Sequence, residues 1–241
     1  MKKIKLATLA LCALMIVSGC GTGTTSNTTK GGLLGAGGGA LLGGIMGNVI
    51  GKNSKSTALG AAIGMAVGTG AGVLIGKKMD KAAAAAAQVK NAQVEQVTDA
   101  NGLTAVKVSF DSGILFTTGS STLQGTAKSS LTQFANVLKQ YSDADVAIQG
   151  YTDNQGWKNS TAEQSAQKNQ ALSLQRAQSV QNYLLSQGVS SAQMKSVEGL
   201  GEANPVADNS TAAGQAQNRR VEVYLYASEA MINAANNGTL Q

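Results

Sequence analysis

Apolar and polar residues follow regular patterns in the C-terminal part of the chain. Between residues 94 and 110, apolar and polar positions alternate on both sides of an Asn-Gly pair, which predicts two strands joined by a tight turn. Apolar residues three or four positions apart predict helices over 120–141 and 172–188. Shorter apolar or alternating stretches predict three further strands, at 143–151, 195–201 and 219–226.

The order of these elements predicts the fold class. Strands that alternate with helices predict an α/β fold, an α+β sandwich built on a βαβαβ-type mixed sheet with the helices on one face. The predicted domain covers 94–227, and 228–241 is predicted to be a poorly ordered tail. Upstream, the lysine- and alanine-rich stretch 77–93 predicts a helical linker that separates the domain from the preceding segment.

Residues 31–76 carry glycine at every fourth position in two uncharged arms, 31–51 and 57–76. The repeating glycines are Gly35, Gly39, Gly43, Gly47 and Gly51, then Gly60, Gly64, Gly68, Gly72 and Gly76. Although glycine disfavours a helix by ~1 kcal/mol relative to alanine, a glycine stripe lets another backbone approach closely. We therefore expect a membrane-associated helical hairpin over 31–76, with homo-oligomerisation as an option. A flexible linker is the alternative.

The N-terminus has the features of a secretory signal over residues 1–19. Three lysines precede an apolar run that is too short to span a membrane, and small residues follow it. Its end, VSGC, resembles the bacterial lipobox, which implies acylation of Cys20 and a tether over 20–30. The residue after the cysteine, Gly21, favours the outer membrane over the inner one. An ordinary signal with a chance cysteine is the alternative.

The composition of the chain excludes several kinds of catalysis, metal site and partner. The absence of histidine excludes Ser-His and Cys-His catalysis and His-ligated metals, and we expect no cofactor. Cys12 is lost with the signal and Cys20 is acylated, so the mature chain has no thiol for a disulfide. Loss of the three signal lysines lowers the formal charge from +6 to +3. Because no basic run is interleaved with aromatics, nucleic acid is not expected as a partner.

Five motifs occur in order along the predicted domain. GYTDNQG (150–156), NQALSLQRAQSV (169–180) and NRRVEVYL (218–225) are the main ones; VSFDSGILF precedes them and GLGEANPVADNSTAAG lies between the last two. This order resembles the peptidoglycan-binding domain of the OmpA family over about 94–227. With the lipobox and the glycine repeat, the whole chain resembles OmpA-family outer-membrane lipoproteins.

The resemblance implies non-covalent binding of the peptide stem of peptidoglycan by a lipid-anchored protein whose domain lies in the periplasm. The stem's diaminopimelate ends in an ammonium and a carboxylate. The resemblance assigns Asp153 to the ammonium and Arg176 to the carboxylate, and a guanidinium suits a carboxylate through paired hydrogen bonds. Four more positions match the family's site: Thr152, Asn169, Arg219 and Asp111.

Each of these residues also has an ordinary structural interpretation. Asp153 on its own fits an Asx-turn, and Arg176 fits a solvated helix position. Arg219 and Arg220 fit charges on an edge strand.

The loop 156–171 is longer than the family's link. Ser160 and Glu163 within it fit a capping box that extends the second helix. Trp157 either covers the ligand or fills a gap under the loop, and we favour the gap.

The predicted role is therefore a non-enzymatic anchor between the outer membrane and the cell wall. The main alternative is an envelope assembly factor that uses the same domain to bind proteins. A motor-stator subunit would need an acidic residue in its spanning helix, and neither glycine arm has one. A wall hydrolase that uses Asp153 and Glu163 as a carboxylate pair is a further alternative.

Overall fold

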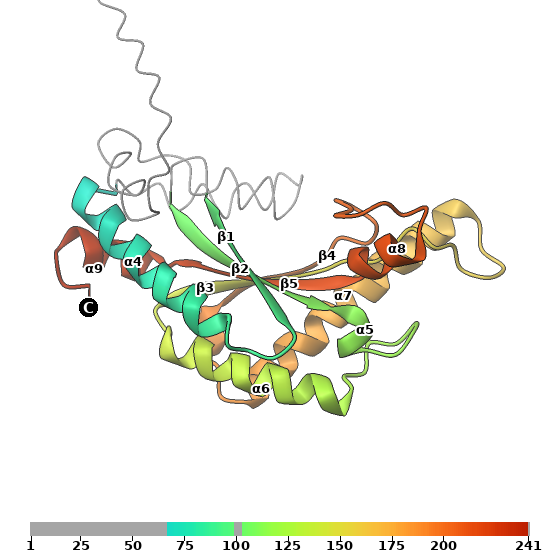
Figure 1. Ribbon diagram of the computed structural model, residues 1–241, viewed down its shortest axis with the longest axis horizontal. Coiled ribbons are helices and arrows are strands. Elements are labelled where there is room, and N and C mark those ends of the chain that lie inside the picture. Colours follow the sequence, from blue (N-terminus) through green and yellow to red (C-terminus); the bar gives the residue numbers. More distant parts are fainter. Residues whose placement is uncertain (1–66, 99–102, 241) are drawn as a thin grey trace, which may run out of the picture.

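A computed structural model of the protein describes residues 67–98 and 103–240. The signal 1–19, Cys20, the tether 20–30, the glycine-rich stretch up to residue 66 and the Asn-Gly turn therefore lie outside the described residues. The described part contains a five-stranded mixed sheet in the order β1-β2-β5-β3-β4 (Figure 1). Strands β3 and β4 are parallel, and the other neighbours are antiparallel.

The observed elements confirm the predicted order of strands and helices. The strands are β1 (Ala92–Thr98), β2 (Thr104–Asp111), β3 (Ala144–Gly150), β4 (Met194–Gly199) and β5 (Arg220–Ala227). The helices are α4 (Thr69–Ala86), α5 (Ser112–Leu115), α6 (Gly125–Gln140), α7 (Ala162–Ser186), the short 3₁₀ helix η1 (Ser191–Gln193), α8 (Ala212–Asn218) and α9 (Glu229–Asn236). None of the helices within the described ranges has the length and hydrophobicity needed to cross a membrane.

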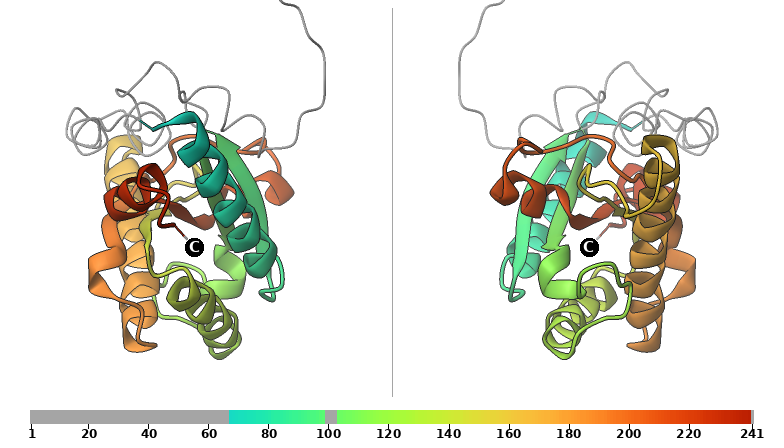
Figure 2. Two further views of the ribbon diagram at one scale, coloured as in Figure 1. Left: turned by 90° about the vertical axis from the view of Figure 1, so that its left-hand side faces the viewer. Right: turned by 90° about the vertical axis from the view of Figure 1, so that its right-hand side faces the viewer.

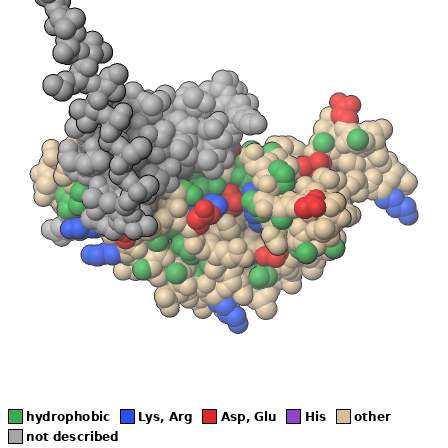
Figure 3. All heavy atoms as spheres, turned by 45° about the horizontal axis from the view of Figure 1, so that its top comes forward, with side chains coloured by type: hydrophobic (Ala, Val, Ile, Leu, Met, Phe, Trp, Pro, Cys, Tyr) green, Lys and Arg blue, Asp and Glu red, His purple; other side chains and the backbone are tan. Residues whose placement is uncertain are grey.

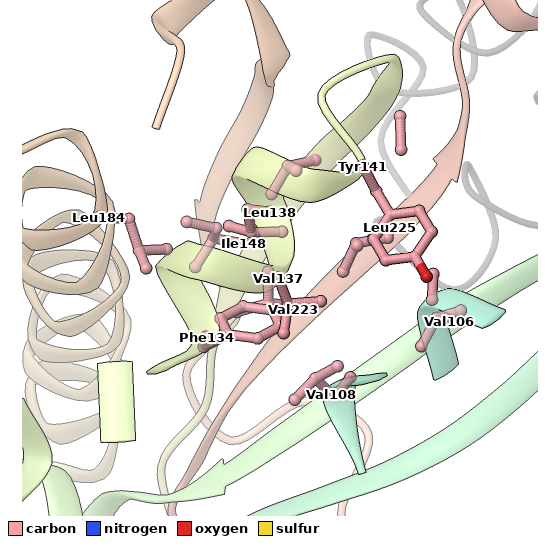
Figure 4. Packing of buried hydrophobic residues seen from close by; sticks show 14 of the residues in the cluster. Val106, Val108, Phe134, Val137, Leu138, Tyr141, Ile148, Leu184, Val223 and Leu225 are labelled. Atoms are coloured by element: carbon pink, nitrogen blue, oxygen red, sulfur yellow. The ribbon is translucent and has the colours of Figure 1, made fainter. Parts of the chain in front are cut away.

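One main core lies between the sheet and its helices. Alternate side chains of β2, β3 and β5 point to the same face, where they meet α6 and α7 (Figure 4). Phe134 of α6 packs edge-to-face on Phe110 of β2, with ring centroids 5.6 Å apart. Helix α4 crosses β1 and β2, whereas α7 follows β3 and β4 (Figures 1 and 2). The sheet and the helices on one face agree with the predicted fold class.

Helix α4 corrects the predicted linker over 77–93. It begins at Thr69, inside the second glycine arm, and it packs on the domain instead of leading away from it. Ile75 and Met79 are fully buried in the same core as the sheet. At its surface, Lys78 forms a 2.6 Å ion pair with Asp143. The physical reason is a stripe of small and apolar residues along α4 that the alanine run conceals in the sequence.

The C-terminal segment is likewise ordered, which corrects the tail predicted over 228–241. Ser228 caps α9 by accepting a hydrogen bond from Met231 N, and Met231 and Ile232 enter the core. The side chain of Asn236 accepts a hydrogen bond from Gly68 N at 3.0 Å. Helices α4 and α9 therefore hold each other against one end of the sheet.

This packing predicts that α4 is part of the folding unit. Met79→Ala should lower the free energy of unfolding by about 2–4 kcal/mol, because it leaves a cavity in a fully buried site. Lys81→Ala, at an exposed position of the same helix, should change it by less than ~0.5 kcal/mol. Urea denaturation followed by circular dichroism measures both. Equal stabilities of the two variants would show that α4 does not belong to the core.

Candidate functional site

The loop that follows β3 begins inside the sheet, because β3 lies between the central strand β5 and the edge strand β4. Tyr151 N donates to Arg220 O at 2.9 Å, and Thr152 N donates to Gly201 O at 2.8 Å. These two bonds tie the loop to β5 on one side and to the segment after β4 on the other. Asp153 is therefore fixed at the strand end, where the sequence places it.

Helix α7 lies unusually close to this strand end. A Cβ on Gly150 would lie 2.0 Å from Ser173 O, and a Cβ on Gly199 would lie 2.3 Å from Leu174 N. Ser173 is fully buried, and its hydroxyl accepts a hydrogen bond from Gly201 N at 2.9 Å. Only glycine allows this approach, and one turn before Ser173 the side chain of Asn169 donates to Gln155 O in the loop of Asp153.

Asp153 is 7% exposed and forms an ion pair with Arg219 through its Oδ2. Its Oδ1 accepts a hydrogen bond from Gln155 N at 3.2 Å, which is the contact of an Asx-turn. Asp153 therefore forms an Asx-turn and also contributes its charge to the site. A carboxylate has about four acceptor positions, so an ammonium can bind beside Arg219.

Arg176, from the middle of α7, is 3% exposed, which contradicts its interpretation as a solvated helix residue. Its Nε donates to Ser120 O at 3.0 Å, and its Cζ lies 5.3 Å from the centroid of the Phe116 ring. Burial lowers the pKa of its guanidinium, the positive charge of Arg219 lowers it further, and Asp153 raises it. Two cations and one carboxylate therefore lie within electrostatic reach of one another.

The other predicted site residues lie at different depths around this cluster. Thr152 is 5% exposed, and its hydroxyl oxygen has no hydrogen-bond partner within residues 67–98 and 103–240. Asp111 ends β2 and caps α5 by accepting a bond from Gly113 N at 2.6 Å. Because Asp111 is paired with Arg220 and Gly150 with Val221 in the sheet register, Asp111 lies at the same end of the sheet as the loop of Asp153, with β5 between them.

Asn169 is buried beside the loop and uses both ends of its amide within the protein. Its Oδ1 accepts from Trp157 Nε1 at 2.7 Å, and its Nδ2 donates to Gln155 O and to Glu202 Oε1, each at 3.1 Å.

The sequence did not identify Ser120, Gln155 and Glu202 as neighbours of the site. The sequence offers no signal for Ser120 or Gln155, since a backbone carbonyl of each makes the contact.

The two adjacent arginines have different roles, and the edge-strand interpretation is wrong because β5 lies inside the sheet. Arg219 faces Asp153, whereas Arg220 is buried on the other face of β5. There Arg220 Nε contacts Glu222 Oε1 at 2.7 Å, and its guanidinium lies 3.7 Å from the Tyr151 ring centroid. Burial, with the nearby Glu222 charge, raises the pKa of the Tyr151 hydroxyl.

Helix α7 begins earlier than in the predicted range 172–188, as the long loop suggested. The capping box is one residue later than expected. The Thr161 hydroxyl accepts from Gln164 N, and the Gln164 side chain accepts from Thr161 N.

On the face shown in Figure 3, charged side chains of both signs are interspersed, and no continuous basic surface is visible among the described residues.

Two family matches cover most of the chain between them. Residues 115–219 match the OmpA family, and residues 1–80 match the YMGG-like Gly-zipper family. The first match contains five of the six predicted site residues; Asp111 lies just before it. The second match includes the lipobox, the glycine repeat and the first part of α4.

Individual relatives are similar to part of the chain. The chain is 44% identical over 112 residues to the probable lipoprotein YiaD of Escherichia coli, which is 46% of this chain and 47% of that protein. It is 45% identical over 93 residues to the peptidoglycan-binding protein ArfA of Mycobacterium tuberculosis, 39% of this chain and 26% of that protein. The similarity thus spans about half of the first relative's length and a quarter of the second's.

A solved structure shares the fold as well. The cell wall anchor of the T6SS from Pseudomonas aeruginosa superposes with a TM-score of 0.50 at 25% identity, over 62% of this chain and 97% of that chain.

Proposed function

We propose, on the premise that residues 115–219 form an OmpA-family domain, that this protein binds the peptide stem of peptidoglycan without covalent chemistry. The observation that supports this most is two buried opposite charges, Asp153 and Arg176, within electrostatic reach of each other, and the Thr152 hydroxyl next to Asp153, which has no hydrogen-bond partner among the described residues. A buried polar group without a partner is costly, so the site favours a polar ligand.

The ligand class follows from the charges. Diaminopimelate in the peptide stem ends in an ammonium and a carboxylate. Its ammonium binds Asp153 beside Arg219, and its carboxylate lies against the guanidinium of Arg176. Because the positive charge of Arg219 disfavours the nearby charge of Arg176, an anion that approaches both relieves their repulsion. Charge-assisted hydrogen bonds in a partly buried site are strong enough to hold such a ligand.

We also propose that the protein is a non-enzymatic envelope lipoprotein that tethers the outer membrane to the wall. The signal, the lipobox with Cys20 and the Gly-zipper match at residues 1–80 support the membrane end of this tether. The named functions of ArfA and of the cell wall anchor support the wall end. Binding to the wall needs no covalent step, and the chain has no histidine to act as a catalytic base.

Co-sedimentation with purified sacculi tests the proposal. The full chain in mild detergent should pellet with sacculi, and excess soluble tripeptide ending in meso-diaminopimelate should return it to the supernatant. The sacculi should release no soluble fragments, as expected of a binding protein. A protein that stays in the supernatant would contradict wall binding and favour the assembly factor.

A further inference from the structure

Trp157 is the only tryptophan in the chain, and it lies in the loop that follows Asp153. Its backbone N donates to the hydroxyl of Ser165 at 3.0 Å, and its indole Nε1 donates to Asn169 Oδ1 at 2.7 Å. Lys168 Nζ lies 5.8 Å from the centroid of its ring. The side chain is therefore bound to the first turns of α7 and half-buried there, in keeping with a packing role.

The indole also determines how the Asn169 amide is oriented. An indole N–H can only donate, so the oxygen of that amide must face Trp157. The Nδ2 group must then face the other side, where it donates to Gln155 O and Glu202 Oε1. Because Asn169 is 4% exposed, water cannot readily replace a lost partner.

A continuous series of hydrogen bonds connects this indole with the carboxylate of the site. Trp157 donates to Asn169, Asn169 donates to Gln155 O, and Gln155 N donates to Asp153 Oδ1. The two bonds to Gln155 involve successive peptide groups joined through its Cα, so each bond restricts the position of the backbone that makes the next one. The loop 153–157 is thereby attached to α7, which also supplies Arg176.

We propose that Trp157 is a positioning residue for Asp153. It fixes the Asn169 amide, and that amide fixes the loop whose backbone holds the carboxylate. The inference rests on the proposed function, and it deepens that function by giving Asn169 a supporting role in place of a ligand contact. It also predicts that occupancy of the site changes the environment of the indole.

The first test compares two variants that each lose one side-chain hydrogen bond donor. Trp157→Phe keeps a ring beside Lys168 but removes the indole donor. Tyr183→Phe removes a hydroxyl of α7 that lies 2.9 Å from Thr132 Oγ1, at the interface with α6 and away from the loop of Trp157. Calorimetry with the tripeptide ending in meso-diaminopimelate, on the full chain in detergent, should show about fivefold to tenfold weaker binding for Trp157→Phe. Tyr183→Phe should bind like the wild type.

The second test uses the emission of the single tryptophan. In the wild type, the tripeptide should change the emission saturably, with the dissociation constant found by calorimetry. In Asp153→Asn, the same concentrations should leave it unchanged. This titration also decides the matter if Trp157→Phe does not fold, because an unchanged wild-type emission at saturation would then overturn the inference.

The outcomes separate this inference from the function on which it rests. If the wild type binds the tripeptide and folded Trp157→Phe binds equally tightly, Trp157 does not position Asp153, although wall binding stands. If the wild type binds neither the tripeptide nor sacculi, the proposed function fails and the inference fails with it. Weaker binding by Trp157→Phe with an unfolding midpoint close to that of Tyr183→Phe supports the positioning role.

Discussion

Gly150→Ala should lower the free energy of unfolding by about 3 kcal/mol or more, and it should abolish binding to the wall. The new methyl group would lie 2.0 Å from the backbone oxygen of Ser173 and 2.8 Å from its carbonyl carbon. Backbone atoms cannot rotate away as a flexible side chain can, so β3 and α7 must separate. Because β3 leads to Asp153 and α7 carries Arg176, this separation also pulls the two charges apart.

Gly125→Ala is the matched control for this change. Gly125 is the first residue of α6, and nothing lies within 4 Å of a Cβ built there. The methyl group should leave the domain unchanged or stabilise it by up to ~1 kcal/mol, since alanine restricts the unfolded chain. Urea denaturation and sacculus sedimentation measure both variants. A Gly150→Ala protein as stable as Gly125→Ala would show that α7 does not approach the strand so closely.

Asp153→Ala and Arg176→Ala should each weaken binding of the peptide stem by about 2–3 kcal/mol or more, which is roughly a 30-fold to 150-fold loss. Each substitution leaves one charged end of the ligand without its partner. Arg176→Lys should restore only part of the affinity, because an ammonium cannot make the paired bonds of a guanidinium. Titration with the soluble tripeptide measures all three variants.

Two exposed charges provide controls for a general electrostatic effect. Lys128→Ala on α6 removes a cation as Arg176→Ala does, and Glu163→Gln in the first turn of α7 removes an anion as Asp153→Ala does. Both should bind like the wild type. The second control also bears on the carboxylate-pair hydrolase, which would need Glu163. Equal losses in the controls and the site variants would point to nonspecific attraction instead of a site.

The parts of the fold that the sequence could predict are those with local signals. Alternation over 94–110 and the helical spacing of α6 and α7 predicted the sheet and its covering helices. The resemblance to the OmpA family, carried by five motifs in order, singled out Asp153 and Arg176 together. The alanine run of α4 predicts a spacer, because it combines high helix propensity with a weak apolar face. Its burial depends on contacts with β1, β2 and α9, which no local pattern describes.

The sequence could not predict which side chains pair with each other within the site, for a similar reason. Of two adjacent arginines, Arg219 pairs with Asp153 and Arg220 pairs with Glu222, and only the direction of each side chain from β5 separates them. The single-residue shift of the capping box to Thr161 is a comparable detail. The hydrogen bond from Trp157 to Asn169 joins residues twelve positions apart. It depends on the conformation of the loop, which no simple sequence rule predicts.

The most direct test of the central claim is calorimetry of the full chain with two tripeptides that differ only in the third residue. One carries meso-diaminopimelate and the other L-lysine, which has the ammonium but lacks the second carboxylate. Recognition of both charges predicts that the lysine peptide binds roughly thirtyfold or more weakly, and that Arg176→Ala removes most of this difference. Equal binding of the two peptides by the wild type would contradict recognition of a zwitterion by Asp153 and Arg176.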